Sequence, residues 1–165
     1  MRNRFLLIIA IIMATGSAKA QTKALFDDFA QDFFILLSDT STIPPLEYIR
    51  IKTWKQLIEE QDLSSLEQQD WIIRKNKDYP QEEAAFRQKL GSLIESYHKA
   101  LGNGASLEFL NADFQADKRW KNWYHCQLRF ILQTEELQTI VQLNYQLYYN
   151  GKGLMFIGTE LEELF

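Results

Sequence analysis

Apolar and polar residues alternate over the last third of the chain. Between Trp123 and Gln133, and again between Leu137 and Tyr149, every second side chain is apolar, with one threonine in the series. A period of two places alternate side chains on opposite faces of a strand, so each segment predicts a β-strand with one buried face. A third apolar run follows at 153–158. The pattern predicts a three-stranded antiparallel meander with one dry face.

Two short turn sequences define the register that we expect between these strands. Glu135-Glu136 is interpreted as a two-residue turn, and Asn150-Gly151 is typical of a type I′ turn, whose central residues both need positive φ. A slip of one residue would expose every apolar side chain, so the register is strongly specified. The expected pairs are Phe130 with Val141, Leu128 with Leu143, Cys126 with Tyr145, Leu147 with Leu154, and Tyr145 with Phe156.

Two amphipathic helices are expected before the meander. Residues 23–37 carry apolar side chains at helical spacing, with acidic residues on the remaining faces. Pro80 and the two acidic residues soon after it are typical of a helix start. From there apolar residues repeat every three or four positions to Leu101, and the glycines of 102–104 end the helix.

Three further short strands are predicted from β-branched and aromatic residues. Residues 46–54 and 71–74 combine isoleucine with tyrosine or tryptophan, which favours strand. Residues 107–110 suggest another strand, followed by a polar loop over 111–118. Residues 160–165 form a short acidic tail.

The N-terminal residues have the pattern of a secretory signal peptide. Arg2 and Arg4 precede an apolar run, which leads to an A-x-A-like cleavage site at 18–20. We therefore expect a signal peptide over 1–20 and a single domain over 21–165. The expected protein is exported, periplasmic or secreted, with no stable membrane anchor after cleavage. The alternative is an uncleaved anchor, for which the apolar run is short.

Composition narrows the classes of function. The net charge of −4 and the scarcity of clustered bases argue against nucleic acid as a partner. The high aromatic content, with Phe 11, Tyr 7 and Trp 4, favours a core of large side chains or an apolar pocket. Cys126 is the only cysteine and falls on the apolar face of its strand, which indicates a small buried side chain rather than a nucleophile.

Motifs of common catalytic and metal sites are absent from the sequence. It has no glycine-rich phosphate loop, no His/Cys metal spacing and no G-x-S-x-G turn. No catalytic residue, metal or cofactor is therefore assigned. The enzymatic alternative is a small lyase, isomerase or hydrolase with His125 or Asp113 as base and a tyrosine as hydrogen-bond donor.

The polar face of the meander is a candidate interface. It carries His125, and the expected register places Trp123 opposite Tyr148 and Ile131 opposite Ile140. An exposed strip of aromatic residues and isoleucines favours sheet-to-sheet packing in a homodimer. The alternative is a solvated outer face, which antiparallel sheets commonly have.

The order of predicted elements resembles the NTF2-like, or cystatin-like, superfamily, most of all its uncharacterised small exported members. The resemblance covers about residues 23–159 and depends on the long helix at 80–101 and the strands at 120–133, 137–149 and 153–158. It implies an α+β fold in which a curved antiparallel sheet wraps a long helix and leaves an apolar pocket. Enzymes of the superfamily place an acid, base or tyrosine hydroxyl there, but no local motif allows those residues to be carried over to this chain.

The pocket implied by this resemblance would be lined by aromatic side chains of the long helix and the inner sheet face. The candidates are Phe86, Tyr97, Tyr124 and Tyr145. Apolar walls and few catalytic groups favour binding over catalysis. We therefore expect an exported, non-enzymatic binding or interaction module that holds an apolar small molecule or peptide and self-associates through its sheet.

Overall fold

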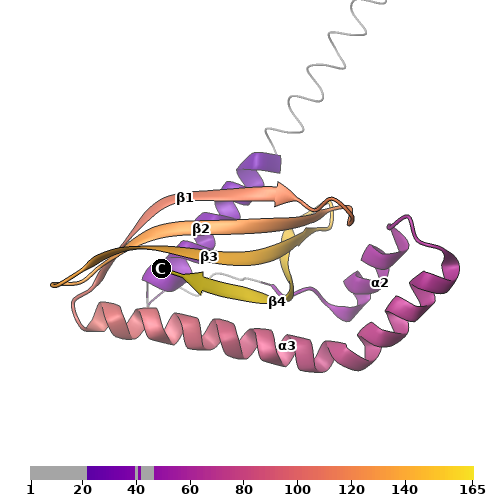
Figure 1. Ribbon diagram of the computed structural model, residues 1–165, viewed down its shortest axis with the longest axis horizontal. Coiled ribbons are helices and arrows are strands. Elements are labelled where there is room, and N and C mark those ends of the chain that lie inside the picture. Colours follow the sequence, from indigo (N-terminus) through magenta and orange to yellow (C-terminus); the bar gives the residue numbers. More distant parts are fainter. Residues whose placement is uncertain (1–21, 40, 42–46) are drawn as a thin grey trace, which may run out of the picture.

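The computed structural model describes residues 22–39, 41 and 47–165. The predicted signal peptide, residues 1–20, lies outside these described residues. Within them, three helices precede a four-stranded antiparallel sheet, which confirms the predicted α+β class (Figure 1). The sheet is open and curved, and a long helix packs against it.

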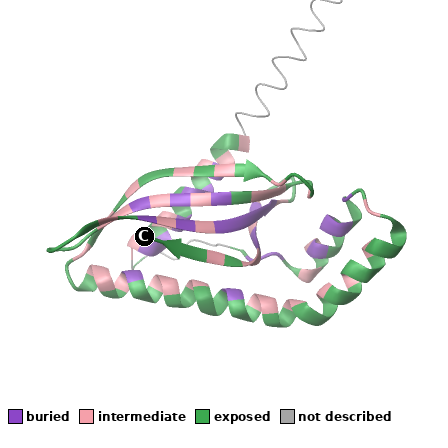
Figure 2. Cartoon of the chain, viewed as in Figure 1, coloured by how far each residue is buried: buried purple, intermediate pink, exposed green. Residues whose placement is uncertain are grey.

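The sheet is a meander of four strands in sequence order. They are β1 (Ser106–Ala116), β2 (Trp123–Gln133), β3 (Gln138–Tyr149) and β4 (Leu154–Leu164), each antiparallel to its neighbour. Buried residues alternate with less buried ones along β2 and the first part of β3, as the period of two predicts (Figure 2). This confirms the meander and the buried inner face of β2 and β3.

The predicted register between β2 and β3 is correct in every pair. Phe130 lies opposite Val141, and the remaining predicted pairs of these two strands are also observed. The turn closes with a hydrogen bond from the Thr134 N–H to the Leu137 carbonyl oxygen (2.8 Å), so Glu135-Glu136 are its two central residues.

The predicted register between β3 and β4 is wrong by two residues. Leu147 pairs with Phe156, and Tyr149 with Leu154. The turn is centred one position later than expected, because the Asn150 N–H donates to the Gly153 carbonyl oxygen at 3.2 Å. Gly151 takes the first central position with φ +84°, where a hairpin turn favours glycine. A shift of two keeps every side chain on its predicted face.

The two outer strands extend beyond the segments predicted for them. β1 continues to Ala116 after a bulge near Leu110, so the polar loop predicted over 111–118 is wrong for most of its length. β4 continues to Leu164 through the expected acidic tail. In both stretches, exposed and half-buried residues of an edge strand alternate. The sequence was interpreted as a polar loop over 111–118 and as an acidic tail over 160–165.

The N-terminal helix, residues 22–38, packs on the inner face of the sheet and confirms the helix predicted over 23–37. Phe26 stacks on Phe114 of β1 with ring centroids 4.2 Å apart. Phe33 meets Tyr145 of β3 edge to face at 5.2 Å. The helix therefore buries its apolar stripe against the dry face, which is the main favourable contribution of an amphipathic helix to stability.

Both segments predicted as strands before the long helix are largely helical. α2 (Ile51–Glu59) occupies most of the first, and residues 71–74 lie inside α3 (Ser65–Gly102). Among the described residues of these two segments, only Tyr48 forms a β-bridge with the sheet, and its partner is Phe156. The buried residues of α2, namely Trp54, Leu57 and Ile58, recur at helical spacing. Burial of this stripe outweighs the β propensity of the individual residues.

α3 begins at Ser65 rather than at Pro80. The Ser64 side chain accepts from the Glu67 N–H (3.3 Å), and the Glu67 carboxylate accepts from the Ser64 N–H (2.9 Å), which together form a capping box. Pro80 lies inside the helix, and α3 is bent (Figure 1), as expected where a proline removes a backbone hydrogen bond. α3 contacts both α2 and β4.

Candidate functional site

The four tryptophans of the chain come together at one end of the sheet. Trp54 belongs to α2, Trp71 to α3, Trp120 to the loop after β1, and Trp123 begins β2. Their rings form a continuous series of contacts: Trp71 to Trp120 at 5.3 Å, Trp120 to Trp123 at 5.7 Å, and Trp123 to Trp54 at 5.7 Å. We call this group the tryptophan cluster.

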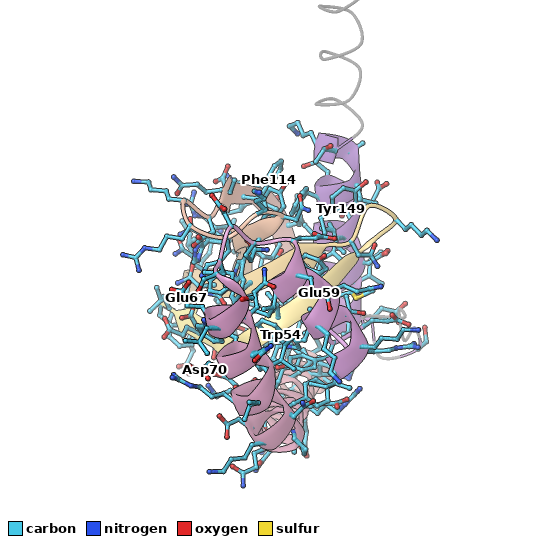
Figure 3. All side chains as sticks on the ribbon, turned by 90° about the vertical axis from the view of Figure 1, so that its right-hand side faces the viewer. Trp54, Glu59, Glu67, Asp70, Phe114 and Tyr149 are labelled. Atoms are coloured by element: carbon cyan, nitrogen blue, oxygen red, sulfur yellow. The ribbon has the colours of Figure 1, made fainter. Side chains whose placement is uncertain are left out.

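A cavity of about 260 Å³ is lined by the whole tryptophan cluster. Its other lining residues are Lys75 of α3, Gln146 of β3 and residues 158–160 of β4. Figure 3 looks onto this end of the molecule, where Trp54 lies between the ribbons of α2 and α3. Two helices, the loop between β1 and β2 and the outer face of the sheet thus line this open cavity, which we call the tryptophan cavity.

Local structure accounts for the position of each wall. Trp71 and Lys75 are four residues apart on α3 and therefore share one helix face. Asp117 holds the loop that carries Trp120, because its Oδ1 accepts from the backbone N–H groups of Arg119 (2.7 Å) and Trp120 (2.8 Å). Such a turn around an aspartate side chain is a common way to order a loop.

Gln61 ties this loop to α2. Its Oε1 accepts from the Lys121 N–H at 2.7 Å, while its Nε2 donates to the Leu57 carbonyl oxygen at 2.7 Å. The Gln61 side chain is buried and both of its polar ends have partners, so it satisfies the usual requirement for a buried polar group. The α2 wall and the loop wall of the cavity are therefore held together.

The third wall is an irregular part of β4. Leu147 pairs with Phe156 and Tyr145 with Leu161, so residues 157–160 lie opposite the single residue Gln146. Gly158 within this bulge has φ +73°. Bulges redirect strands and are common beside functional sites, and this one brings Thr159 and Glu160 to the cavity.

Lys75 contributes a cation to the cavity wall. Its Nζ lies 4.1 Å from the centroid of the Trp54 ring, which is within the range of a cation–π interaction. It also forms a salt bridge with Glu82. The Lys75 side chain is only 11% exposed, so its charge is stabilised by a ring and a carboxylate rather than by bulk water.

A chain of hydrogen bonds leads from the cavity along the outer face of the sheet to Asp117. The Gln146 Nε2 donates to Oε2 of Glu160 (2.6 Å) and lies 3.5 Å from Nδ1 of His125. Nε2 of His125 lies 2.8 Å from Oδ2 of Asp117. Because a carboxylate only accepts, Nε2 of His125 is the donor in its contact with Asp117.

Asp117 is stabilised as a carboxylate by these contacts. Its burial alone would raise the pKa, but hydrogen bonds from His125 and from the N–H groups of Arg119 and Trp120 outweigh burial and lower the pKa of Asp117 below its ordinary value. The charge of Asp117 is thus part of what holds the loop in place.

Two indole N–H groups of the tryptophan cluster have no partner among the described residues. They are Nε1 of Trp54 and Nε1 of Trp123, both fully buried. A buried donor without an acceptor costs about 1–3 kcal/mol. Native proteins seldom leave such groups unpaired without a functional reason or a bound water, so the cluster is short of hydrogen-bond acceptors.

The predicted exposed strip on the polar face of the sheet is divided in two. Trp123 lies opposite Tyr148 and Ile131 opposite Ile140, as predicted. However, Tyr148 is only 1% exposed, and its hydroxyl donates to Glu60 at 3.3 Å. Burial, with the nearby Glu60 carboxylate, raises the pKa of Tyr148 to about 12. The prediction that this end of the strip is exposed is wrong, because α2 and the tryptophan cluster cover it.

The other end of the polar face is open. Ile140 is 59% exposed, beside the half-buried Ile131. Leu137 in the β2–β3 turn and Leu164 at the end of β4 are also exposed. These four residues are here called the apolar end of the sheet, which includes Ile131 and Ile140 of the predicted interface.

The four aromatic residues predicted to line an inner pocket pack against other rings. Three of them, Phe86, Tyr97 and Tyr145, are at most 3% exposed, and Tyr124 is half-buried. The ring partners include Phe156 for Phe86 and Tyr145, Phe130 for Tyr97, and Phe26 for Tyr124. The ligand-binding role predicted for these four residues stays a prediction. They belong to the inner side of the sheet, and the tryptophan cavity lies on its opposite face.

The residues considered for catalysis either contact other polar side chains or are buried. Both ring nitrogens of His125 face other side chains, as described above. The Asp113 side chain is 65% exposed and lies 3.5 Å from Arg129. Cys126 is buried, and burial raises the pKa of its thiol well above the ordinary value, so it has the character of an inert core cysteine. Within the described ranges, no cluster of His, Cys, Asp or Glu could hold a metal ion.

Sequence reasoning did not find the cavity residues Trp54, Trp71, Lys75, Trp120, Gln146 and Glu160. One available signal was the S-x-x-E sequence of Ser64 and Glu67, a capping-box pattern that starts a helix. A helix from Ser65 would have placed Trp71 and Lys75 on one face. Nothing in the spacing could have brought the two helical tryptophans to those of the β1–β2 connection.

No family model, curated protein or solved structure matches the chain. The resemblance to the NTF2-like superfamily therefore stays a prediction. In the part of the chain that the structure describes, every helix is too short or too polar to cross a lipid bilayer.

Proposed function

We propose that this protein is a non-enzymatic binding protein for a small molecule and that the tryptophan cavity is its binding site. The observation that carries the proposal is the placement of all four tryptophans of the chain around one cavity of about 260 Å³. Aromatic walls with a few placed polar groups are the usual composition of a ligand site. The tightly packed inner aromatics give less support to the site first expected among Phe86, Tyr97, Tyr124 and Tyr145.

The contacts and exposure of the two candidate bases, His125 and Asp113, favour binding over catalysis. A general base needs a free lone pair within hydrogen-bond reach of a substrate. Both ring nitrogens of the half-exposed His125 side chain already contact other side chains, and the exposed Asp113 carboxylate lies beside Arg129. A lyase, isomerase or hydrolase remains the less supported alternative.

Export is part of the same proposal. The support is the basic start, apolar run and A-x-A-like site within residues 1–20, which lie outside the described residues. Expression with the complete leader, followed by N-terminal sequencing of the product, should give Gln21 as the first residue. A product that starts at the leader's own N-terminus would contradict cleavage.

The binding proposal is tested by a fragment screen that uses saturation-transfer NMR. We expect fragments that bind the wild-type protein and lose their signal in Trp71→Ala, because Trp71, at 37%, is the exposed tryptophan of the cavity wall. The matched control is Ile73→Ala, two residues away on α3 and 66% exposed. Circular dichroism of each variant checks the fold.

A fragment library without any binder that depends on Trp71 would overturn the proposed function. Binding that is lost equally in Trp71→Ala and Ile73→Ala would overturn the site, because the second change leaves the cavity intact. Fragments that bind the inner aromatic residues instead would support the pocket first expected among Phe86, Tyr97, Tyr124 and Tyr145.

A second candidate function is self-association through the apolar end of the sheet. The specific observation is the exposure of Ile140 beside Ile131, with Leu137 and Leu164 at the same end. Exposed apolar patches of this kind are frequent at interfaces. A second copy of the chain could cover it by two-fold sheet packing.

Light scattering tests this second candidate. We expect a dimer for the wild type, a monomer for Ile140→Asp, and an unchanged dimer for Ile73→Asp, which places the same charge on an exposed isoleucine of α3. A monomeric wild type would contradict the proposal.

A further inference from the structure

We propose that the tryptophan cavity takes an uncharged, polyhydroxylated ring, that is, one sugar ring. This inference rests on the proposed function and adds the chemical class of the ligand. Three features of the cavity carry it: the indole faces, the unpaired indole donors, and the presence of a charge of each sign in the wall.

The indole faces suit the C–H surface of a sugar ring. An aromatic ring has a negative face and a positive edge, so weakly positive C–H groups pack favourably on the face. Trp71 is 37% exposed, and Trp120 is half-buried. Their rings stand edge to face, with an interplanar angle of 88°, so a bound ring can lie on one indole and touch the other.

The polar groups of the wall match hydroxyl groups. The Nε1 donors of Trp54 and Trp123 lack acceptors, whereas Glu160 offers a carboxylate that only accepts. A hydroxyl group both donates and accepts, so one ring with several hydroxyls can address both kinds of partner. Both N–H groups are buried, so a ligand hydroxyl pairs with them only when the ring of Trp54 or Trp123 rotates.

The charges of the wall disfavour a charged ligand. A cation would meet Lys75, whose ammonium already occupies the face of Trp54 at 4.1 Å. An anion would meet the carboxylate of Glu160, which lines the same cavity. The Lys75 side chain is only 11% exposed, so repulsion between its charge and a cation is stronger there than in water. A neutral ligand avoids both repulsions.

The size of the cavity limits the ligand to about one ring. Pockets for drug-sized molecules commonly measure about 300–1,000 Å³. The tryptophan cavity, at about 260 Å³, lies below that range. A longer saccharide would have to present a terminal ring to the site.

Isothermal titration calorimetry with defined probes tests the inference. The probes are methyl glycosides of glucose, galactose, mannose and N-acetylglucosamine, with choline as the cation and benzoate as the anion. We expect 1:1 binding of at least one glycoside, with a Kd of about 0.1–10 mM. Binding should weaken about tenfold or more in Trp71→Ala, and several-fold in Glu160→Gln, while Ile73→Ala leaves it unchanged.

The outcomes separate the inference from the proposed function. The sugar inference would be overturned if choline or benzoate bound more tightly than every glycoside and this binding depended on Trp71. The proposed binding site would then still hold. The sugar inference would also be overturned if fragments bound in a way that depends on Trp71 but no glycoside bound. If neither the glycosides nor any fragment depended on Trp71, both the inference and the proposed function would fall.

Discussion

Gly158 faces the side chain of Gln146 so closely that a β-carbon at position 158 would lie 2.8 Å from the Gln146 Oε1. Gln146 cannot easily move away, because its Nε2 donates a hydrogen bond to Glu160 at 2.6 Å and the residue is only 8% exposed. The bulge of β4 and the polar wall of the tryptophan cavity therefore depend on the absence of a side chain at position 158.

Alanine at this position should destabilise the fold more than alanine at the comparable Gly151. Both glycines have positive φ, but a β-carbon at Gly151 would meet nothing within 4 Å. We expect Gly151→Ala to cost about 1–2 kcal/mol from backbone strain alone. Gly158→Ala should cost about 1–3 kcal/mol more through overpacking. Urea unfolding measures both, and equal costs would contradict the close contact with Gln146.

The register of the meander predicts opposite effects for two adjacent substitutions. Leu143 is fully buried on the inner face, whereas Gln142 lies on the outer face and accepts from Arg129 at 3.0 Å. Leu143→Asp buries an unpaired charge and should cost about 4–5 kcal/mol or more, enough to unfold a typical domain. Gln142→Asp should remain folded by circular dichroism. Equal tolerance of both changes would show that the faces are assigned wrongly.

Removal of the Tyr48 hydroxyl should not weaken the fold. This hydroxyl is buried without a hydrogen-bond partner among the described residues, and burial raises its pKa above the ordinary value. Tyr48→Phe should therefore leave the free energy of unfolding unchanged or increase it by up to about 1 kcal/mol. The control is Tyr97→Phe, which loses a hydrogen bond to the Glu163 carboxylate and should cost about 1.5–3 kcal/mol. A marked loss of stability in Tyr48→Phe would indicate a hidden partner, such as an ordered water.

The acid side of the stability profile should depend on Asp117. Its pKa is lowered in the folded protein, so the fold favours the carboxylate. The stabilising contribution is therefore complete above the ordinary pKa of 3.8 and is lost as the pH falls through the lower, folded pKa. Asp117→Asn should be less stable than the wild type at pH 7, and the difference should shrink below pH 3.8. Urea midpoints across this pH range measure it, and a constant difference would contradict the role of the charge.

The parts of the fold that could be predicted are those specified by local pattern. The period of two and the Glu135-Glu136 turn were sufficient for every pair between β2 and β3. Helical spacing was sufficient for the helix over 22–38. The Asn150-Gly151 sequence predicted the centre of the β3–β4 turn one position too early. The Asn150 side chain accepts from the N–H groups of Lys152 and Gly153 and starts the turn later.

The parts that could not be predicted depend on contacts between distant segments. Trp54 and Trp71 have strand-favouring neighbours, yet both lie on helices. Trp54 belongs to the buried stripe of α2, and Trp71 follows the capping box that starts α3. Pro80 has the signature of a helix start, but the capping box at Ser64 starts the helix earlier. The cavity joins α2, α3, a loop and the β4 bulge, so no single segment carries its signal.

The most direct test of the tryptophan cavity is to follow the four indole N–H resonances by ¹⁵N–¹H correlation NMR during titration with a bound fragment or glycoside. Single Trp→Phe variants would assign the four signals. We expect several of these signals to shift together, with those of Trp54 and Trp123 moving downfield as their donors gain acceptors. Unchanged indole signals, with shifts confined to inner residues such as Tyr97 and Tyr145, would contradict the site.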